Sequence, residues 1–141
     1  MRNTLLRYGA AAVLAHAAVM LPHGAAHAGE AAVLSPLASA YVILVIMLAP
    51  FVALGLLRAG RLRPGALLLF GSMLGALLFG IIYHYLIPGS DHVAHVPAGP
   101  WQLPFQITSA LLIVTEGAGT IVGAWMLYIL GRTAVRSGHQ V

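Results

Sequence analysis

The side chains best suited to chemistry lie in one stretch, from Tyr83 to Trp101, between two hydrophobic segments that are each long enough to cross a bilayer. Neutral imidazole and carboxylate groups are good ligands for Zn²⁺ and Cu²⁺. The stretch contains four such groups, which are His84, Asp91, His92 and His95. We therefore predict that these residues engage a metal ion, either copper or zinc.

The spacing of the loop histidines sets a condition on this prediction. His92 and His95 are three positions apart, so their side chains share a face only if the segment forms a helical turn. Asp91 could cap such a turn, and Pro97 would end it. Two other roles fit the same residues: they could anchor the loop at the membrane surface or contact a partner, or they could form a pH-responsive switch.

A second candidate is Glu116, which lies near the middle of the last hydrophobic segment. An ionised carboxylate at that depth costs about 2.5 kcal/mol or more unless it is paired, hydrated or protonated. On a helix, Ser109 and Thr120 lie on the same side as Glu116. This polar stripe indicates either proton or cation transfer between helices, or a structural hydrogen bond from Glu116 to Ser72 or to a backbone carbonyl.

The residue types that the chain lacks or scatters exclude several cofactors. There is no cysteine, which rules out disulfides, thiolate metal sites and cysteine-ligated iron–sulfur centres. Only His84 lies inside a span of the predicted mature protein, whereas a membrane b-type haem needs two histidines at similar depth. Met47, Met73 and Met126 are spread over the predicted helices without the clustering expected of a copper(I) pathway.

Composition places the chain among membrane proteins. Hydrophobic residues make up 60% of the sequence and charged residues 7%, and the mean hydropathy is +0.93. A soluble domain of 141 residues could not bury so much apolar surface. The basic residues are all arginines that lie mostly beside hydrophobic segments, which is typical of topology determinants and not of nucleic-acid contacts. The expected partner is a lipid bilayer, and no nucleic acid is expected.

Residues 1–28 have the features of a secretory signal. Arg2 and Arg7 precede an alanine-rich apolar core of about 14 residues, and the segment ends on the small-residue sequence Ala26-His27-Ala28. We predict cleavage after Ala28. The alternative is that the segment remains as an uncleaved first membrane helix.

Residues 29–141 are predicted to form a three-helix membrane domain. Its spans are 37–57, 66–86 and 105–130, with an outer loop between the second and the third. Pro50 should kink the first span near residues 46–50, because proline has no N–H to donate. The arginine-rich segments after the first and third spans should stay in the cytoplasm. We expect an all-α multi-pass protein of a bacterial inner membrane, with the N-terminus outside after cleavage and the C-terminus cytoplasmic.

Small residues in the second and third predicted spans favour close helix packing. They are Gly71, Gly75, Gly80, Gly119 and Gly123. Helices associate in lipid through such close packing, because burial of apolar surface gives no advantage there. We expect these faces to contact other spans, other membrane subunits or a second copy of the chain.

A nucleophile and a base at a recognisable spacing are absent from the sequence, so we favour a non-catalytic role. The prediction is a small inner-membrane accessory subunit whose outer His/Asp loop binds a metal ion or a partner at the membrane surface. One alternative is a proton- or ion-conducting subunit of an oligomer that uses Glu116. The other is a structural assembly factor of a membrane complex.

Overall fold

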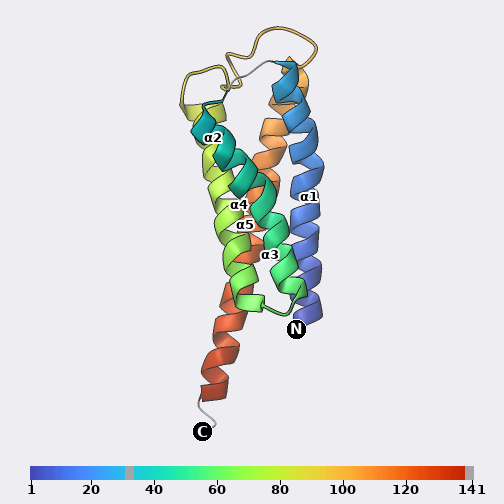
Figure 1. The fold of residues 1–141 in the computed structure, drawn as a ribbon, viewed down its shortest axis with the longest axis vertical. Coiled ribbons are helices and arrows are strands. Elements are labelled where there is room, and N and C mark those ends of the chain that lie inside the picture. Colours follow the sequence, from blue (N-terminus) through green and yellow to red (C-terminus); the bar gives the residue numbers. More distant parts are fainter. Residues whose placement is uncertain (31–33, 139–141) are drawn as a thin grey trace.

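In the computed structural model, which describes residues 1–30 and 34–138, every regular element of the described chain is a helix. Four helical segments are long and apolar enough to cross a membrane: Arg2–Gly29, Pro36–Arg58, Leu62–Leu86 and Gln102–Arg132. They pack lengthwise as a bundle (Figure 1). The protein is therefore a helical membrane protein, as predicted. It has one candidate span more than the three that we expected after the signal segment.

The additional span is α1 (Arg2–Gly29), which covers the predicted signal segment. Its apolar side chains enter the main hydrophobic core, which contains Leu5, Val13, Ala53, Leu57, Ala66, Leu69, Met73 and Met126. Tyr8 of α1 also meets Trp125 edge to face, with ring centroids 5.4 Å apart. Cleavage after Ala28 stays a prediction. Removal of α1 would, however, expose this core.

The second span changes its winding along its length. It consists of α2 (Pro36–Tyr41), the π-helical η1 (Val42–Leu48) and α3 (Ala49–Arg58). Pro50, near the start of α3, cannot donate a hydrogen bond to the carbonyl of Ile46 one turn earlier. His16 Nε2 of α1 lies 3.2 Å from that oxygen and supplies the missing donor. The winding changes from π-helical to α-helical within residues 46–50, where we expected a kink.

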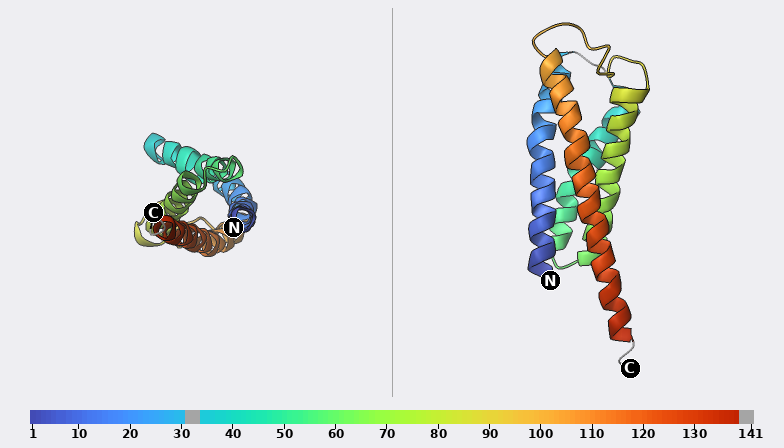
Figure 2. Two further views of the ribbon diagram at one scale, coloured as in Figure 1. Left: turned by 90° about the horizontal axis from the view of Figure 1, so that it is seen from below. Right: turned by 180° about the vertical axis from the view of Figure 1, so that it is seen from behind.

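The third and fourth spans make a close pair. A turn at Gly60, whose φ is +80°, leads into α4 (Leu62–Ile81), which continues as the π-helical η2 (Ile82–Leu86). The last helix, α5 (Gln102–Gly138), extends past the others beyond the end that holds the N-terminus (Figure 2). At the contact of α4 with α5, a Cβ added to Gly123 would lie 2.7 Å from the Cα of Phe70. Only a residue without a side chain fits there.

The other glycines for which we predicted packing differ in their surroundings. A Cβ at Gly75 would meet the hydroxyl of Tyr41, and one at Gly119 would meet the side chain of Met73 at 2.8 Å. A Cβ at Gly71 would have no atom within 4 Å. Within the described chain, close approach therefore occurs at Gly75 and Gly119, as at Gly123, and not at Gly71.

Residues 87–101 fold over one end of the bundle, which we call the loop end. The backbone N–H of Val93 donates to the carbonyl of His84 at 3.0 Å, and Gln106 Nε2 donates to the carbonyl of Val93 at 2.9 Å. These bonds fix the loop on the helices and bury Asp91. At the opposite end, the arginine end, the Arg2 side chain donates to the carbonyl of Arg58 at 2.7 Å.

Candidate metal centre

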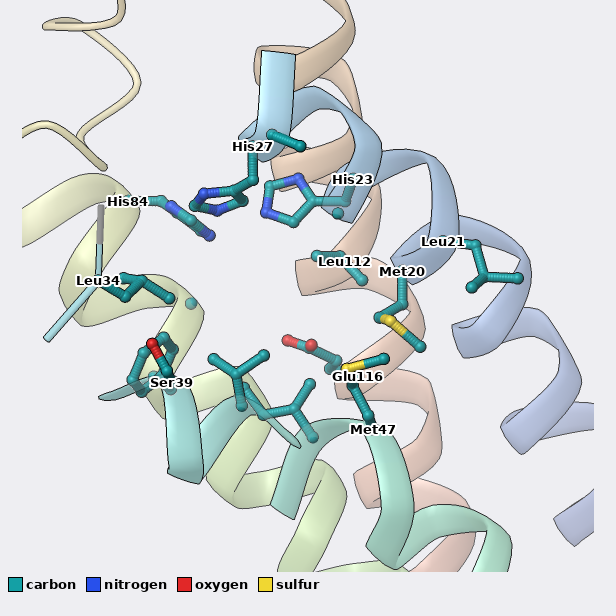
Figure 3. Close-up of a pocket in the computed structure, with 16 residues that line it drawn as sticks. Met20, Leu21, His23, His27, Leu34, Ser39, Met47, His84, Leu112 and Glu116 are labelled. Atoms are coloured by element: carbon teal, nitrogen blue, oxygen red, sulfur yellow. The ribbon is translucent and has the colours of Figure 1, made fainter. Parts of the chain in front are cut away.

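Three histidine side chains converge at the loop end of the bundle. His23 and His27 come from one face of α1, four positions apart, and His84 comes from η2. One ring nitrogen of each histidine lies within 4.8 Å of the corresponding nitrogens of the other two. Figure 3 shows the three rings facing one another. Phe105 of α5 packs against all three rings, with centroid separations of 5.0 to 5.3 Å.

The hydrogen bonds of His23 leave one of its nitrogens free. The Thr108 hydroxyl donates to the carbonyl of Pro104 at 2.7 Å, so its oxygen accepts from His23 Nδ1, which lies 2.9 Å away. With the proton on Nδ1, Nε2 carries a lone pair. That nitrogen is buried and has no hydrogen-bond partner among the described residues. A buried acceptor without a partner is costly unless something occupies it, and a metal cation would do so.

His84 shows the same arrangement. Its Nδ1 lies 2.9 Å from the backbone carbonyl of Asp91, which can only accept, so the proton is on Nδ1 and the lone pair is on Nε2. Histidine ligands of metals usually donate their second nitrogen to a carbonyl or carboxylate in this way, which fixes the tautomer and the orientation of the ring. The position of the ring follows from η2, in which the Ile87 N–H bonds to the carbonyl of Ile82 five residues earlier.

Asp91 places a carboxylate behind this cluster. Its Oδ1 lies 3.0 Å from His27 Nε2, and its Oδ2 lies 3.5 Å from His84 Nδ1. Both are ion-pair distances, although neither contact has the angles of a good hydrogen bond. Burial opposes ionisation of Asp91, but the adjacent His27 and the nearby His84 outweigh it and hold the pKa of Asp91 below its ordinary value. An ionised carboxylate here would raise the basicity of the histidines as ligands.

The dimensions fit a transition metal after a small contraction. Zinc–nitrogen bonds of about 2.0–2.1 Å in tetrahedral geometry put neighbouring ligand atoms about 3.3 Å apart. The three nitrogens lie within 4.8 Å of one another, so side-chain movements of about 1.5 Å would complete the site. Imidazole ligands suit both zinc and copper. Three histidines leave a fourth position for water, a carboxylate or another donor.

The structure brings together two of the four predicted loop ligands. His84 and Asp91 belong to the cluster, whereas His92 and His95 form a separate pair with ring centroids 4.7 Å apart. The turn that we required for them is present, since the His95 N–H donates to the carbonyl of His92 at 2.8 Å. Both nitrogens of His92 are engaged, one with the Tyr85 carbonyl at 3.2 Å and the other with the Ala94 N–H at 3.1 Å. His92 would have to break one of these bonds to bind a metal.

Sequence reasoning missed His23 and His27, because both lie in the segment interpreted as a signal. A usable pattern was nevertheless present: His16, His23 and His27 are spaced by seven and four positions, which places them on one face of a helix. All three face the interior of the bundle and not the lipid. Ionisable residues on the inward face of a membrane helix are candidates for a functional site.

A cavity of about 440 Å³ extends from the histidine cluster toward the middle of the bundle. Its wall includes all three histidines and, farther along, Glu116 (Figure 3). The rest of the lining is mostly apolar and includes Met20 and Met47. His84 and Glu116, which belong to two separate candidate groups in the sequence, therefore border one space.

The hydrogen bond from Glu116 to Ser72 that we considered is not formed. Ser72 donates to the carbonyl of Leu69 at 3.2 Å, and Thr120 donates to the backbone carbonyl of Glu116 at 2.8 Å. Ser109, also on the predicted stripe, donates to the carbonyl of Phe105 at 2.7 Å. The nearest charged or ionisable neighbour of the Glu116 carboxylate is His16, with Nδ1 3.8 Å from Oε1.

Comparisons with known protein families, curated proteins and solved structures give no match.

Proposed function

We propose that this protein binds one zinc or copper ion at the loop end of its membrane bundle through His23, His27 and His84. The observation that supports this proposal most directly is the free lone pair on His23 and on His84. In each ring the other nitrogen is committed to an oxygen of the protein, which is the arrangement that prepares histidines for a metal. Asp91 stands behind two of the rings as a carboxylate partner.

The proposal requires that α1 remains in the protein. Cleavage after Ala28 would remove two of the three ligands, so we adopt the uncleaved alternative. Four spans then place Arg2 and Arg7, the loop at residues 58–63 and the end of α5 on one side of the membrane, in agreement with the positive-inside rule. The histidine cluster lies on the other side. In a bacterial inner membrane that side is the periplasm.

We further propose a binding role without catalysis. The hydroxyl beside the cluster, that of Thr108, donates to the Pro104 carbonyl and accepts from His23 Nδ1, so His23 does not activate it as a nucleophile. Large apolar side chains such as Leu44, Val114 and Ile121 are exposed on the outside of the bundle. They would face lipid or other membrane subunits, consistent with an accessory subunit or a homo-oligomer.

The direct test is the zinc content of the full-length protein, purified in detergent and loaded with a small excess of Zn²⁺. We expect the double variant His23→Gln/His84→Gln to lose one zinc ion per chain relative to the wild type. The matched control is His92→Gln/His95→Gln, which removes two histidines from the loop and should retain the full zinc content. Equal zinc content in all three proteins would contradict the proposal. Loss of zinc in the control alone would assign the site to the loop pair.

A second candidate function, an ion-conducting subunit, is favoured by one observation: Glu116 lines the same cavity as the histidines. Reconstituted wild type and Glu116→Gln should then differ in proton or cation flux. Equal flux in the two proteins would exclude it.

A further inference from the structure

We infer that Glu116 and His16 form a second cation site, deeper in the membrane, at which Glu116 borders the same cavity as the histidine cluster. We call it the inner site, and the histidine cluster the outer site. The inference rests on the proposed function for the choice of cation, a transition metal such as Zn²⁺. It does not need the outer site to be occupied first.

The inner site has two buried ligand atoms without partners. The exposed fractions of Glu116 and His16 are 2% and 1%. Glu116 Oε2 and His16 Nδ1 make no hydrogen bond within the described chain. Native proteins seldom leave such atoms unsatisfied, because they have lost their hydration without gaining a hydrogen bond, and the cost is greater for a charged group. A ligand that accepts electron pairs from both would remove this cost.

The distance between the two side chains suits a bridging cation. His16 Nδ1 and Glu116 Oε1 are 3.8 Å apart, which is too long for a direct hydrogen bond. Two ligands with metal–ligand bonds of about 2.0–2.2 Å lie about 3.3 Å apart in tetrahedral geometry and up to about 4.2 Å apart on opposite sides of the ion. The observed separation falls within this range.

Pro50 and the π-helix prepare His16 as a ligand. Because Pro50 leaves the Ile46 carbonyl without its helical donor, His16 Nε2 can donate to that oxygen, at 3.2 Å. The proton is therefore on Nε2, and the lone pair of Nδ1 faces Glu116. This is the same arrangement of one committed and one free nitrogen that occurs in the outer site.

Charge also favours a cation at this depth. The chain has three acidic residues, and Glu116 is the one that lies inside a membrane span. No arginine of the described chain pairs with it, so an ionised Glu116 would lack a counter-charge. A metal ion would supply that charge, and the low dielectric of the site would strengthen the attraction.

Gly80 lies between the two sites. A Cβ added there would be 3.6 Å from Glu116 Oε2 and 3.9 Å from His84 Cδ2, so the position borders both ligand sets at ordinary contact distance. Gly80 also lines the cavity. A large side chain at this position would fill the space through which an ion passes from one site to the other.

Zinc stoichiometry in four full-length proteins tests the inner site. We expect two zinc ions per chain in the wild type, one in Glu116→Gln, one in His23→Gln/His84→Gln and none in the combined variant. His16→Gln, which keeps a donor for the Ile46 carbonyl, should behave as Glu116→Gln does. His16→Gln therefore serves as a second test of the inner site if Glu116→Gln folds poorly.

The possible results separate the two sites. If the wild type holds one zinc that only the outer variant loses, the inner site is wrong and the outer site stands. If the one zinc is lost only with Glu116→Gln, the outer site is wrong and the inner site stands. If the wild type holds none, both are wrong.

The shared cavity is tested by Gly80→Leu beside Gly71→Leu on the same helix, where an added Cβ meets nothing within 4 Å. In stopped-flow loading with Zn²⁺, we expect Gly80→Leu to slow the second binding phase at least tenfold and Gly71→Leu to leave both phases unchanged. Identical loading of the two variants would show that the sites do not communicate through this cavity.

Discussion

At the scale of single residues, both proposed sites depend on which ring nitrogen of each histidine carries the proton, as well as on where the ring lies. Three histidines, His16, His23 and His84, each give one nitrogen to an oxygen of the protein and keep the other free. The oxygens differ in origin: two are backbone carbonyls and one is a hydroxyl. Each oxygen accepts a hydrogen bond and so fixes which of the two neutral tautomers its histidine adopts. Each of these three hydrogen bonds can be tested separately.

Thr108 offers the cleanest of these tests, because its hydroxyl orients His23 without being a ligand. Thr108→Val removes the acceptor for His23 Nδ1, so the ring loses its tautomer preference and its fixed orientation. We expect the zinc affinity of the outer site to fall about 10- to 100-fold, measured by competition with a chromogenic chelator. Thr115→Val is the matched control, since Thr115 lies on the same helix and bonds only to carbonyls of α5. Equal affinities for the two variants would argue against a role of Thr108 in the site.

Of the residues that the structure brings together at the histidine cluster, sequence reasoning had named His84 and Asp91. The clustering of His84 and Asp91 in one short stretch was visible, and both lie in the cluster. His23 and His27 could not be assigned with them, because their ring contacts with His84 depend on how α1 and η2, far apart in the sequence, are placed in the bundle. Nothing local in the sequence encodes those contacts. For Glu116, burial was predictable from its depth in an apolar segment, but its neighbour His16 was not.

At the scale of elements, irregular helices position the functional groups. The two π-helical segments, η1 and η2, each lie beside a candidate site: η1 presents the Ile46 carbonyl to His16, and η2 carries His84. π-Helical turns are costly and occur often at functional positions. The regular helices, α4 and α5, instead supply close packing that holds the spans in register.

Gly123 should be the most sensitive point of that packing. Gly123→Ala would place a Cβ 2.7 Å from the Phe70 backbone, which cannot move as a flexible side chain could. We expect a loss of stability of about 1–3 kcal/mol, seen as a lower thermal midpoint in detergent. Gly117→Ala, which meets nothing within 4 Å, should leave the midpoint unchanged or raise it, since alanine favours helix over glycine by up to about 1 kcal/mol. Equal stability of Gly123→Ala and Gly117→Ala would mean that α4 and α5 lie farther apart at Gly123 than the structure shows.

At the scale of the whole molecule, hydropathy predicted most of the architecture. The expected spans 37–57, 66–86 and 105–130 correspond to Pro36–Arg58, Leu62–Leu86 and Gln102–Arg132, since about 20 apolar residues in a row leave few alternatives. Hydropathy did not distinguish a cleaved signal from an uncleaved membrane helix for residues 1–28. A short alanine-rich apolar core is compatible with a leader and with a helix, and only its packing partners distinguish them.

The intact mass of the protein purified from membranes shows whether residues 1–28 have been cleaved. We expect a mass near 14.7 kDa, that of the full 141-residue chain. The packing of α1 in the bundle and the contribution of His23 and His27 to the proposed outer site both require the uncleaved chain. A species that begins at Gly29 would remove His16, His23 and His27 together and with them both proposed sites.

The fold of residues 26–30 has a consequence for the biogenesis of the protein. The predicted processing sequence is the last turn of α1, where the Glu30 N–H bonds to the Ala26 carbonyl at 2.9 Å and Ala26 is buried against Phe105. A peptidase needs that backbone extended and accessible, which the assembled bundle does not allow. A signal peptidase could therefore act on this segment only before the bundle assembles. Assembly would then protect the last turn of α1, and with it the histidines of that helix, from processing.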